Sequence, residues 1–226
     1  MKYYIASFPK CGNTWARFIV ANLLYDNTEI NFLNIHDIVP EDVVNVTNLT
    51  STGLKAYKTH SKYLPIFEKV IYIMRDPFDA MYSYHQYINF EKNERLTIDQ
   101  VVRHKDYGII ALREHVESYV YGCHDMLLLS YEKLSSDICK CISQIADYMS
   151  ITIDEITLNS IATKCSFQYM RNLEIAKGRK HYNPNFTFMR KGNIGEGRCV
   201  IGQDTALTQF IDSEIAKSAL LRYLYG

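Results

Sequence analysis

Short apolar runs that end in turn residues alternate along this chain with longer segments of helical periodicity. Four of these runs predict β-strands, at residues 2–8, 54–58, 69–74 and 126–130. The run at 69–74 is continuous and rich in branched residues, which is typical of a strand buried on both faces of a parallel sheet. The pattern therefore predicts at least one strand in the centre of a sheet.

The segments between the strands have apolar residues spaced three and four positions apart, as amphipathic helices do. One helix is predicted to open at Thr14. Another follows Asp76 and Pro77, which supply an N-cap and a first-turn proline, and extends to about Phe90. Further helices are predicted at 96–105, 109–121, 138–149, 153–165 and 206–225. Residues 172–199 are rich in glycine and break the pattern, so they are predicted to form a long loop that is a candidate lid over a ligand.

Strands that alternate with helices favour an α/β fold in which helices flank a central parallel sheet. The chain has 226 residues, of which 47% are hydrophobic and 22% charged, so we expect one domain over 1–226 rather than two. The formal net charge is zero. A nucleic-acid partner held by bulk electrostatics is therefore disfavoured, and any anion site must come from local placement of Lys and Arg.

Two features of the chain predict a cytoplasmic protein without a membrane partner. The first motif begins within ten residues of the start, which leaves no room for a signal peptide, and no apolar run approaches membrane-spanning length. The cysteines stand at positions 11, 123, 139, 141, 165 and 199. Because their spacing shows neither a zinc motif nor a redox pair, we expect free thiols in a reducing compartment.

Residues 8–15, Phe-Pro-Lys-Cys-Gly-Asn-Thr-Trp, join the first predicted strand to the first predicted helix. Such a strand-loop-helix unit presents free backbone N–H groups and the positive end of a helix dipole, so it resembles the phosphate site of P-loop kinases. Lys10 adds a mobile charge, and Asn13 and Thr14 add donors. The Walker motif fails on residue order because Lys10 precedes Gly12. An ordinary turn with a solvated lysine is the alternative.

Two further segments carry groups that suit a phosphate. Arg75 ends a predicted buried strand, at the edge where α/β sheets bind their ligands, and Ser83 follows eight residues later. Residues 190–192 are Arg-Lys-Gly. A planar guanidinium donates paired hydrogen bonds to phosphate oxygens. The alternative for Arg75 is a structural salt bridge with Asp76 or Asp79.

Together these three segments resemble the cytosolic sulfotransferase family, whose donor is 3′-phosphoadenosine 5′-phosphosulfate (PAPS). Residues 8–15 are similar to its 5′-phosphosulfate loop, Tyr/Phe-Pro-Lys-x-Gly-x-Thr-Trp. Residues 75–83 are similar to Arg-Asn-Pro-x-Asp-x-x-x-Ser, whose Arg and Ser hold the 3′-phosphate. Residues 190–195 are similar to the start of Arg-Lys-Gly-x-x-Gly-Asp-Trp-Lys, after which Glu196 and Gly197 replace Asp and Trp.

The resemblance implies a donor site and an adenine site. The family stacks adenine between the loop Trp and a Phe, here Trp15 and Phe167, and uses a Tyr-Glu turn that begins here at Tyr131. The residues implied in binding PAPS are Lys10, Cys11, Gly12, Asn13, Thr14, Trp15, Arg75, Ser83, Tyr131, Phe167, Arg190, Lys191 and Gly192.

The resemblance also assigns the chemistry. Lys58-Thr59-His60 follows a predicted strand and resembles the family's Lys-Thr-His, in which the histidine is the general base. A histidine titrates near neutral pH and can accept a hydroxyl proton without a metal. Lys10 is then the leaving-group partner, and Lys58 a second positive group. Taken by itself, a histidine in the position of His60 is more often structural than catalytic. The spacing of His and carboxylate residues matches no metal motif, so PAPS is the only cofactor expected and no metal is implied.

The implied reaction is transfer of a sulfonate group from PAPS to a hydroxyl or amine of a small-molecule or carbohydrate acceptor, as in the bacterial-like branch of the family. The acceptor should contact segments 26–54, 84–108 and 172–189. The basic cluster Lys177, Arg179, Lys180 and His181 could bind an anionic acceptor or be solvated. The oligomeric state is open, a homodimer included.

Two alternative functions stay open on the sequence. A nucleotide kinase would share the strand-loop-helix plan, although the Gly-Lys-Ser/Thr order is missing. A non-catalytic sensor of PAPS, or of the product 3′-phosphoadenosine 5′-phosphate (PAP), would keep the pocket without turnover. The presence of both Lys10 and His60 argues against a sensor, because a protein that catalyses no reaction needs neither group.

Overall fold

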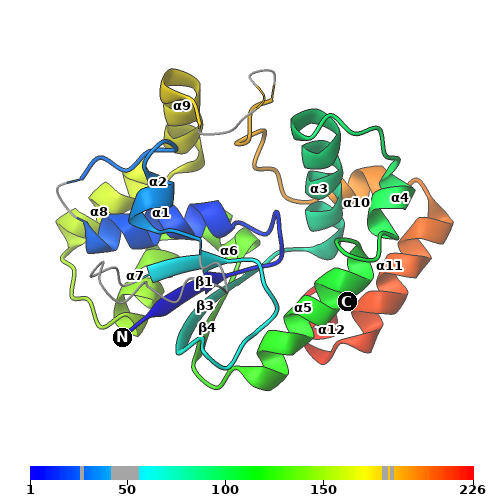
Figure 1. Ribbon diagram of the computed structural model, residues 1–226, viewed down its shortest axis with the longest axis horizontal. Helices are drawn as coiled ribbons and strands as arrows, with labels where there is room; N and C mark the ends of the chain where they lie inside the picture. Colours follow the sequence, from blue (N-terminus) through cyan, green and yellow to red (C-terminus); the bar gives the residue numbers. More distant parts are fainter. Residues whose placement is uncertain (26–27, 42–55, 180–182, 184–185) are drawn as a thin grey trace.

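The computed structural model describes residues 1–25, 28–41, 56–179, 183 and 186–226. Four parallel strands form the sheet in the order β2-β1-β3-β4. Their bounds are β1 Tyr3–Ala6, β2 Ala56–Thr59, β3 Lys69–Met74 and β4 Met126–Ser130. The predicted parallel α/β fold is thereby confirmed (Figure 1). Residues 54 and 55 of the second predicted strand lie outside the described residues.

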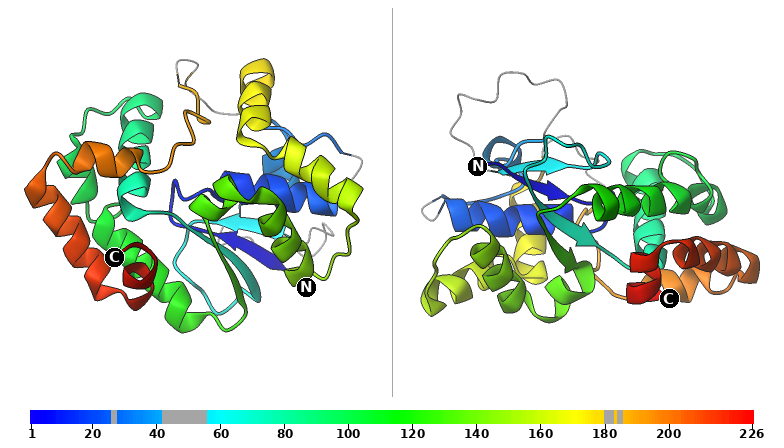
Figure 2. Two further views of the ribbon diagram at one scale, coloured as in Figure 1. Left: turned by 180° about the vertical axis from the view of Figure 1, so that it is seen from behind. Right: turned by 90° about the horizontal axis from the view of Figure 1, so that it is seen from below.

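Helices cover both faces of this sheet (Figures 1 and 2). They are α1 Asn13–Leu24, α2 Ile35–Ile38, α3 Pro77–Glu91, α4 Ile98–Val102, α5 Ile109–Gly122, α6 Tyr131–Ser136, α7 Ile138–Tyr148, α8 Glu155–Lys164, α9 Phe167–Lys177, α10 Glu196–Ile201, α11 Thr205–Lys217 and α12 Ala219–Tyr225. Because side chains alternate along a strand, Tyr3 and Ile5 of β1 join the core beside α1 and α7, whereas Tyr4 and Ala6 join the core beside α5 and α11.

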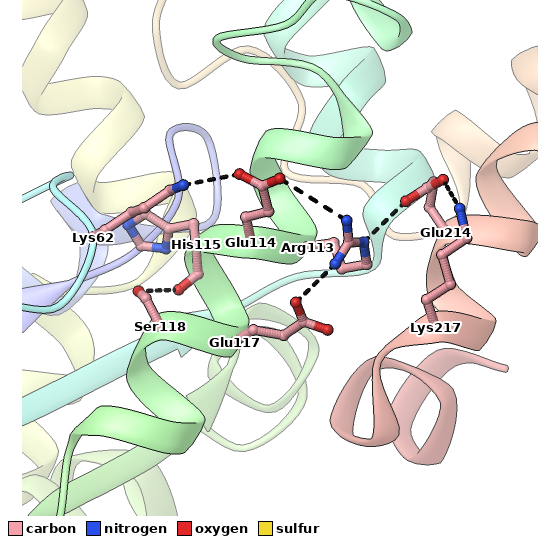
Figure 3. A network of polar contacts seen from close by, with 8 residues as sticks. All are labelled: Lys62, Arg113, Glu114, His115, Glu117, Ser118, Glu214 and Lys217. Carbon is pink, nitrogen blue, oxygen red and sulfur yellow. Dashed lines mark hydrogen bonds and ion pairs between the residues drawn. The ribbon is translucent and has the colours of Figure 1, made fainter.

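The helix α5 is fastened to α11 by an ion-pair network (Figure 3). Arg113 Nε lies 2.9 Å from Glu214 Oε2, and Arg113 Nη1 lies 2.7 Å from Glu117 Oε2. Glu214 also pairs with Lys217 of its own helix. This network lies outside the site described below and stabilises the packing of the C-terminal helices.

The loop predicted over 172–199 is wrong in its bounds. The helix α9 continues to Lys177, and α10 begins at Glu196. Ser166 caps α9 by accepting from the backbone N–H of Tyr169, and the buried carboxylate of Glu174 receives the chain that returns over the helix. These tertiary contacts extend a segment whose local composition favours a loop.

Other helix boundaries also differ from the prediction. The helix expected over 96–105 is shorter and comprises only α4. The chain then turns so tightly that a side chain at Gly108 would lie 2.3 Å from the carbonyl oxygen of Val102. The helix expected over 206–225 is split by extended backbone at Ser218, which lets α12 fold back and bury Leu221. The short helices α2 and α6 were not predicted. Within the described part of the chain, no helix combines the length and apolar character needed to span a bilayer.

Candidate active site

The carboxyl ends of β1, β2 and β3 open into a cavity of about 380 Å³. Of the residues predicted from the sequence, those that line it are Lys10, Gly12, Asn13, Thr14, Trp15, Lys58, His60, Arg75, Ser83, Tyr131, Phe167, Arg190, Lys191 and Gly192. Cys11 is the exception. Three sequence segments more than fifty residues apart thus contribute to one site, as open α/β sheets arrange their ligand sites.

The loop between β1 and α1 is shaped for close approach of a ligand to its backbone. Lys10 has a positive φ of 68° and Gly12 a φ of 100°. A side chain on Gly12 would lie 3.0 Å from the ring of Tyr131. Gly12 caps α1 without any side-chain hydrogen bond, so the first-turn N–H groups of the helix are available to an anion.

Cys11 turns away from the cavity into the core beside α5. Its side chain is 2% exposed, and burial raises the pKa of the thiol to about 12. Its backbone N–H donates to the carbonyl oxygen of Phe8. The prediction that Cys11 binds the donor is therefore not supported by its position: the residue packs beneath the loop instead.

Lys10 points over two aromatic rings. Its Nζ lies 3.9 Å from the ring centre of Phe188 and 4.6 Å from that of Tyr87. Burial, together with the charges of Arg75 and Arg179, lowers the pKa of Lys10 to about 7. The lysine is thus a cation whose charge depends on a neighbouring anion.

Asn13 ties the two neighbouring strand ends together. Its Nδ2 donates to the carbonyl oxygen of Ile5 at 3.0 Å and to that of Thr59 at 3.3 Å. Thr59 immediately precedes His60. The first helical residue after the loop therefore fixes the position of the predicted base relative to the loop.

His60 is held in one tautomer. Its Nδ1 lies 2.8 Å from the carbonyl oxygen of Ser7, and because a carbonyl can only accept, Nδ1 carries the proton. The other ring nitrogen, Nε2, is then the one with a free lone pair. Burial and the charge of Lys58 lower the pKa of His60 to about 4. The imidazole is neutral at pH 7, as a proton acceptor must be.

Lys58 is already neutralised within the chain. Its Nζ lies 2.7 Å from Glu41 Oε1, and the two residues also form an isolated parallel bridge between their backbones. The side chain of Lys58 is largely buried and lines the cavity. Burial lowers its pKa, while Glu41 acts in the opposite direction.

Arg75 connects the loop between β1 and α1 with the segment 190–195. Its Nη1 donates to the carbonyl oxygen of Lys10 and its Nη2 to that of Asn193, both at 3.2 Å, while the guanidinium stacks 4.1 Å from the ring centre of Tyr131. Its buried Nε has no hydrogen-bond partner. The alternative of a salt bridge to an adjacent aspartate does not apply, because both aspartates have other partners.

Those two carboxylates organise the neighbouring backbone instead. Asp76 caps α3 and pairs with Arg198 at 2.7 Å. Asp79 accepts the backbone N–H groups of Gly195 and Gly197, each at 2.7 Å. The third segment is thus fastened to the start of α3, beside Arg75.

Arg190 and Lys191 share one counter-ion, Glu196. The guanidinium of Arg190 binds its carboxylate with two hydrogen bonds, of 2.6 and 3.2 Å, and Lys191 Nζ lies 3.0 Å from Oε1. These cations lower the pKa of Glu196. Glu196 lines the cavity as well, so a carboxylate of the chain lies where two predicted phosphate ligands meet.

Aromatic rings flank the same cations. The indole Nε1 of Trp15 donates to the carbonyl oxygen of Cys165 at 2.7 Å, and its ring meets that of Tyr131 edge to face at 5.4 Å. A side chain on Gly192 would lie 2.6 Å from the ring of Phe167. Trp15 and Phe167 both line the cavity, and the backbone at Gly192 lies close to the ring of Phe167.

The three segments predicted to contact the acceptor all reach the cavity. The lining residues that they contribute are Phe32, Ile35, His36, Tyr84, Tyr87, Arg179, Phe188 and Met189. The two members of the basic cluster that the structure describes are paired: Arg179 with Glu91 and Glu174, and Lys177 with Glu29. Lys180 and His181 lie outside the described residues.

Sequence reasoning missed two lining residues that carry charge. Arg17 lies in α1 and is 2% exposed, and Glu196 is the counter-ion described above. A single arginine within the apolar run Trp-Ala-Arg-Phe-Ile-Val was the available signal for Arg17. Among the residues that the structure describes, no group of three or more His, Cys, Asp or Glu side chains could hold a metal ion.

The arrangement defines a class of site: an α/β fold with a strand-loop-helix anion loop, cations from three segments and a neutral histidine in one cavity. Such a site suits transfer of an anionic group to an acceptor activated by a base.

Comparison with known proteins identifies the family. A family model for the sulfotransferase domain matches residues 2–201, so the chain belongs to the sulfotransferase family. Cytosolic sulfotransferase 17 of Arabidopsis thaliana is 25% identical over 234 residues, covering 86% of this chain and 68% of the relative. Cytosolic sulfotransferase 15 of the same plant is 26% identical over 262 residues, covering 96% and 72%. The predicted family and enzyme class, a PAPS-dependent sulfotransferase, are confirmed.

Solved structures show the same fold. Retinol dehydratase in complex with androsterone and inactive cofactor PAP superimposes with a TM-score of 0.78 at 20% identity, over 96% of this chain and 80% of that one. A mouse sulfotransferase complexed with PAP gives a TM-score of 0.76 at 20% identity, over 99% and 87%. The nucleotide kinase and the non-catalytic sensor gain no support from these comparisons.

Proposed function

We propose that this chain transfers a sulfonate group from PAPS to a hydroxyl group of a small-molecule acceptor and releases PAP. One observation carries the proposal: a histidine with its Nδ1 proton committed to Ser7 lines the same cavity as the phosphate-binding cations Lys10, Arg75 and Arg190. The proposal is supported by the matched sulfotransferase family and by PAP in two similar structures. A carbohydrate or an amine as acceptor has no comparable support.

The residues present fit the donor. The buried Nε of Arg75 has no partner among the described residues, and no side chain caps the first-turn N–H groups of α1. Lys10 and the start of α1 would hold the 5′-phosphosulfate. Arg75, Ser83, Arg190 and Lys191, with the backbone at Gly192, would hold the 3′-phosphate. Trp15, Tyr131 and Phe167 would contact the adenine.

Three residues divide the chemistry between them. PAPS supplies the sulfonate group and a phosphate as leaving group. Nε2 of His60 takes the proton of the acceptor hydroxyl as that oxygen bonds to sulfur and the bond from sulfur to the phosphate oxygen breaks. Lys10 compensates the negative charge that develops on the departing phosphate, and Lys58 adds positive charge beside the sulfonate.

The electrostatics of the ligand-free site suit these roles. A pKa of about 4 keeps His60 unprotonated at neutral pH, so the base is ready before the acceptor arrives. The same low pKa makes it a weak base. An anion bound nearby raises the pKa of a histidine, because it favours the charged form. Donor binding should therefore strengthen the base at the stage when it is needed.

The test is transfer of radiolabelled sulfate from PAPS across a panel of phenols and alcohols. His60→Ala should lower kcat by roughly a hundred- to ten-thousand-fold while its affinity for PAP stays within about twofold of the unaltered protein. His104→Ala, a histidine outside the cavity that stacks on Tyr107, is the matched control and should keep full activity. Ordinary turnover in His60→Ala would remove this residue from the mechanism.

We also propose that the reaction takes place in the cytoplasm. The support is that the Arabidopsis relatives are named cytosolic sulfotransferases. Fractionation of cells with an antibody against the untagged chain, assayed beside cytoplasmic and membrane markers, would test it; recovery with the membrane fraction would contradict it.

A further inference from the structure

The Arg17 side chain is a buried cation that lines the cavity. It is 2% exposed, and it extends from α1 toward α2. Its Nη2 donates to two carbonyl oxygens, that of Ile35 at 3.1 Å and that of Val39 at 2.7 Å. Its Nε is buried and has no hydrogen-bond partner. The guanidinium thus uses one nitrogen to hold the end of α2 and keeps donor capacity for another group.

No carboxylate of the described residues lies within ion-pair distance of Arg17. Glu41 acts on it electrostatically, but the carboxylate of Glu41 is bound to Lys58 at 2.7 Å. Two other arginines that line the cavity, Arg179 and Arg190, each have a carboxylate partner. Burial lowers the pKa of Arg17 to about 10, so the group still carries its charge at neutral pH. A buried charge without a counter-ion is costly, and a ligand anion would complete it.

The position of Arg17 relates it to the predicted base. Asn13 and Arg17 are four residues apart in α1 and so lie on one face, separated by one helical turn. Asn13 contacts the carbonyl of Thr59, directly before His60. The charge of Arg17 is among the causes that lower the pKa of His60. Arg17 is therefore close to the base.

Several other residues that line the cavity are aromatic. Phe32 and His36 come from the segment that leads into and through α2, Tyr84 and Tyr87 from α3, and Phe188 from the segment before α10. Aromatic side chains bury flat rings well, since offset and edge contacts between π systems are favourable. These surroundings fit a ring that carries the reacting hydroxyl.

We infer that the acceptor is a hydroxylated aromatic compound with a carboxylate, and that Arg17 selects it by binding this carboxylate. The inference rests on the proposed function and specifies its acceptor. The carboxylate pairs with the guanidinium while the hydroxyl faces Nε2 of His60 in the same cavity. An acceptor without the carboxylate leaves the arginine buried and unpaired.

The experiment compares matched acceptors. 3- and 4-hydroxyphenylacetate are offered beside their methyl esters, with radiolabelled PAPS as donor. For the unaltered protein, kcat/KM should be at least about tenfold higher for the acids, because only they supply the counter-ion. In Arg17→Gln, whose amide can still donate to the carbonyls that end α2, this preference should fall to about twofold or less. Arg17→Lys keeps a charge and should keep part of the preference.

The controls separate a structural role from a selective one. If Arg17 only held α2, Arg17→Gln would lower the rates for acids and esters by the same factor, and the inference would fail. Equal rates for acid and ester in the unaltered protein would overturn it as well, with the proposed function intact because sulfate is still transferred. Failure of the proposed function looks different, since neither PAP binding nor transfer to any acceptor would be seen.

A binding measurement covers two remaining cases. In one the Arg17 variant folds poorly, and in the other sulfate is transferred to none of the acceptors in the panel. Trp15 is the single tryptophan and lines the cavity, so its fluorescence reports occupancy. Titration of the PAP complex of the unaltered protein with phenylacetate and with methyl phenylacetate should show at least about tenfold tighter binding of the acid. Equal affinities would refute the role of Arg17.

Discussion

Two ends of the cavity differ in how their cations are paired. At the end that we assign to the donor, Arg75 donates to backbone carbonyl oxygens and has no carboxylate partner among the described residues, whereas Arg190 and Lys191 share one carboxylate. At the end that we assign to the acceptor, Lys58 and Arg179 are paired with carboxylates of the chain. Lysine and arginine side chains in one cavity thus have different roles, and these roles depend on whether a carboxylate of the chain is bound to them. Arg179, which is paired with two buried carboxylates, holds the fold, whereas Arg75, which donates to carbonyl oxygens, is available to a ligand.

The first prediction tests the structural side of this comparison. Arg179→Met should lower the free energy of unfolding by about 3 kcal/mol, because it strands the buried carboxylates of Glu91 and Glu174. Backbone N–H groups still donate to both, which keeps the loss at the low end for a broken buried pair. Denaturant unfolding measures it.

A matched control for that variant is Arg103→Met. Arg103 makes an exposed pair with Asp99, and such a pair contributes at most about 1 kcal/mol. Equal stability losses in the two variants would mean that Arg179 is no more structural than a surface arginine.

The second prediction tests the donor end. Arg75→Met should weaken PAP binding about a hundredfold, or about 2.7 kcal/mol, because charge-assisted hydrogen bonds to a phosphate are lost. Its effect on stability should be smaller than that of Arg179→Met, since Arg75 strands no carboxylate. Isothermal titration calorimetry measures the affinity. Unchanged PAP affinity would show that Arg75 belongs with the structural cations after all.

The third prediction follows from the pKa of Lys10, which is about 7 in the ligand-free site. The lowered pKa means that the charge is present below pH 7 and is lost as the pH rises above it. PAP should raise this pKa, so binding at pH 8 should take up close to one proton, and affinity should fall by up to about tenfold per pH unit above 7. Calorimetry in buffers of different ionisation enthalpy measures the uptake.

Lys10→Met serves as the control for that titration. It should bind PAP more weakly and without the proton uptake, because the titrating group has been removed. Uptake that persists in this variant would assign the titration to another residue.

The smallest predicted effect concerns Glu196. Glu196→Gln should tighten PAP binding about fivefold, or about 1 kcal/mol, because Arg190 and Lys191 lose the carboxylate that competes with the phosphate. The gain is limited because Lys191 is 55% exposed and screened by solvent. Glu155→Gln makes the same charge change outside the cavity and should bind PAP unchanged. Weaker binding in Glu196→Gln would show that this carboxylate shapes the site and does not compete for it.

Much of the fold and of the donor end could be predicted because the signals are local. A short branched run predicts β3, and the glycine and lysine of residues 8–15 predict an anion loop whatever the rest of the chain does. His60 was predicted from the resemblance of Lys58-Thr59-His60 to a family motif, which is a local signal as well. The buried position of Cys11 was not predicted, since a motif gives the order of residues along a loop and does not say which side chains turn into the core.

The acceptor end could not be predicted to the same depth. The basic cluster around Arg179 suggested either an anion site or solvated charges, yet Glu91 of α3 and Glu174 of α9 neutralise that arginine. The sequence showed little sign of a role for Arg17. Its proposed role depends on the absence of a carboxylate partner among the described residues, and no local sequence pattern could report that. Helix boundaries failed for a related reason: the buried carboxylate of Glu174 anchors the returning chain and extends α9 beyond its local preference.

By itself, the order of residues determined the strands, the turns between strands and helices, and the motifs of the donor site, since each depends on neighbours a few positions away. Only the tertiary structure decided which cations form ion pairs within the chain and which are available to bind a ligand. The physical reason is that the energy of a buried charge depends on the nearest opposite charge. For Arg179 such a partner is Glu91, which lies 88 positions away in the sequence and meets the arginine only in the folded chain.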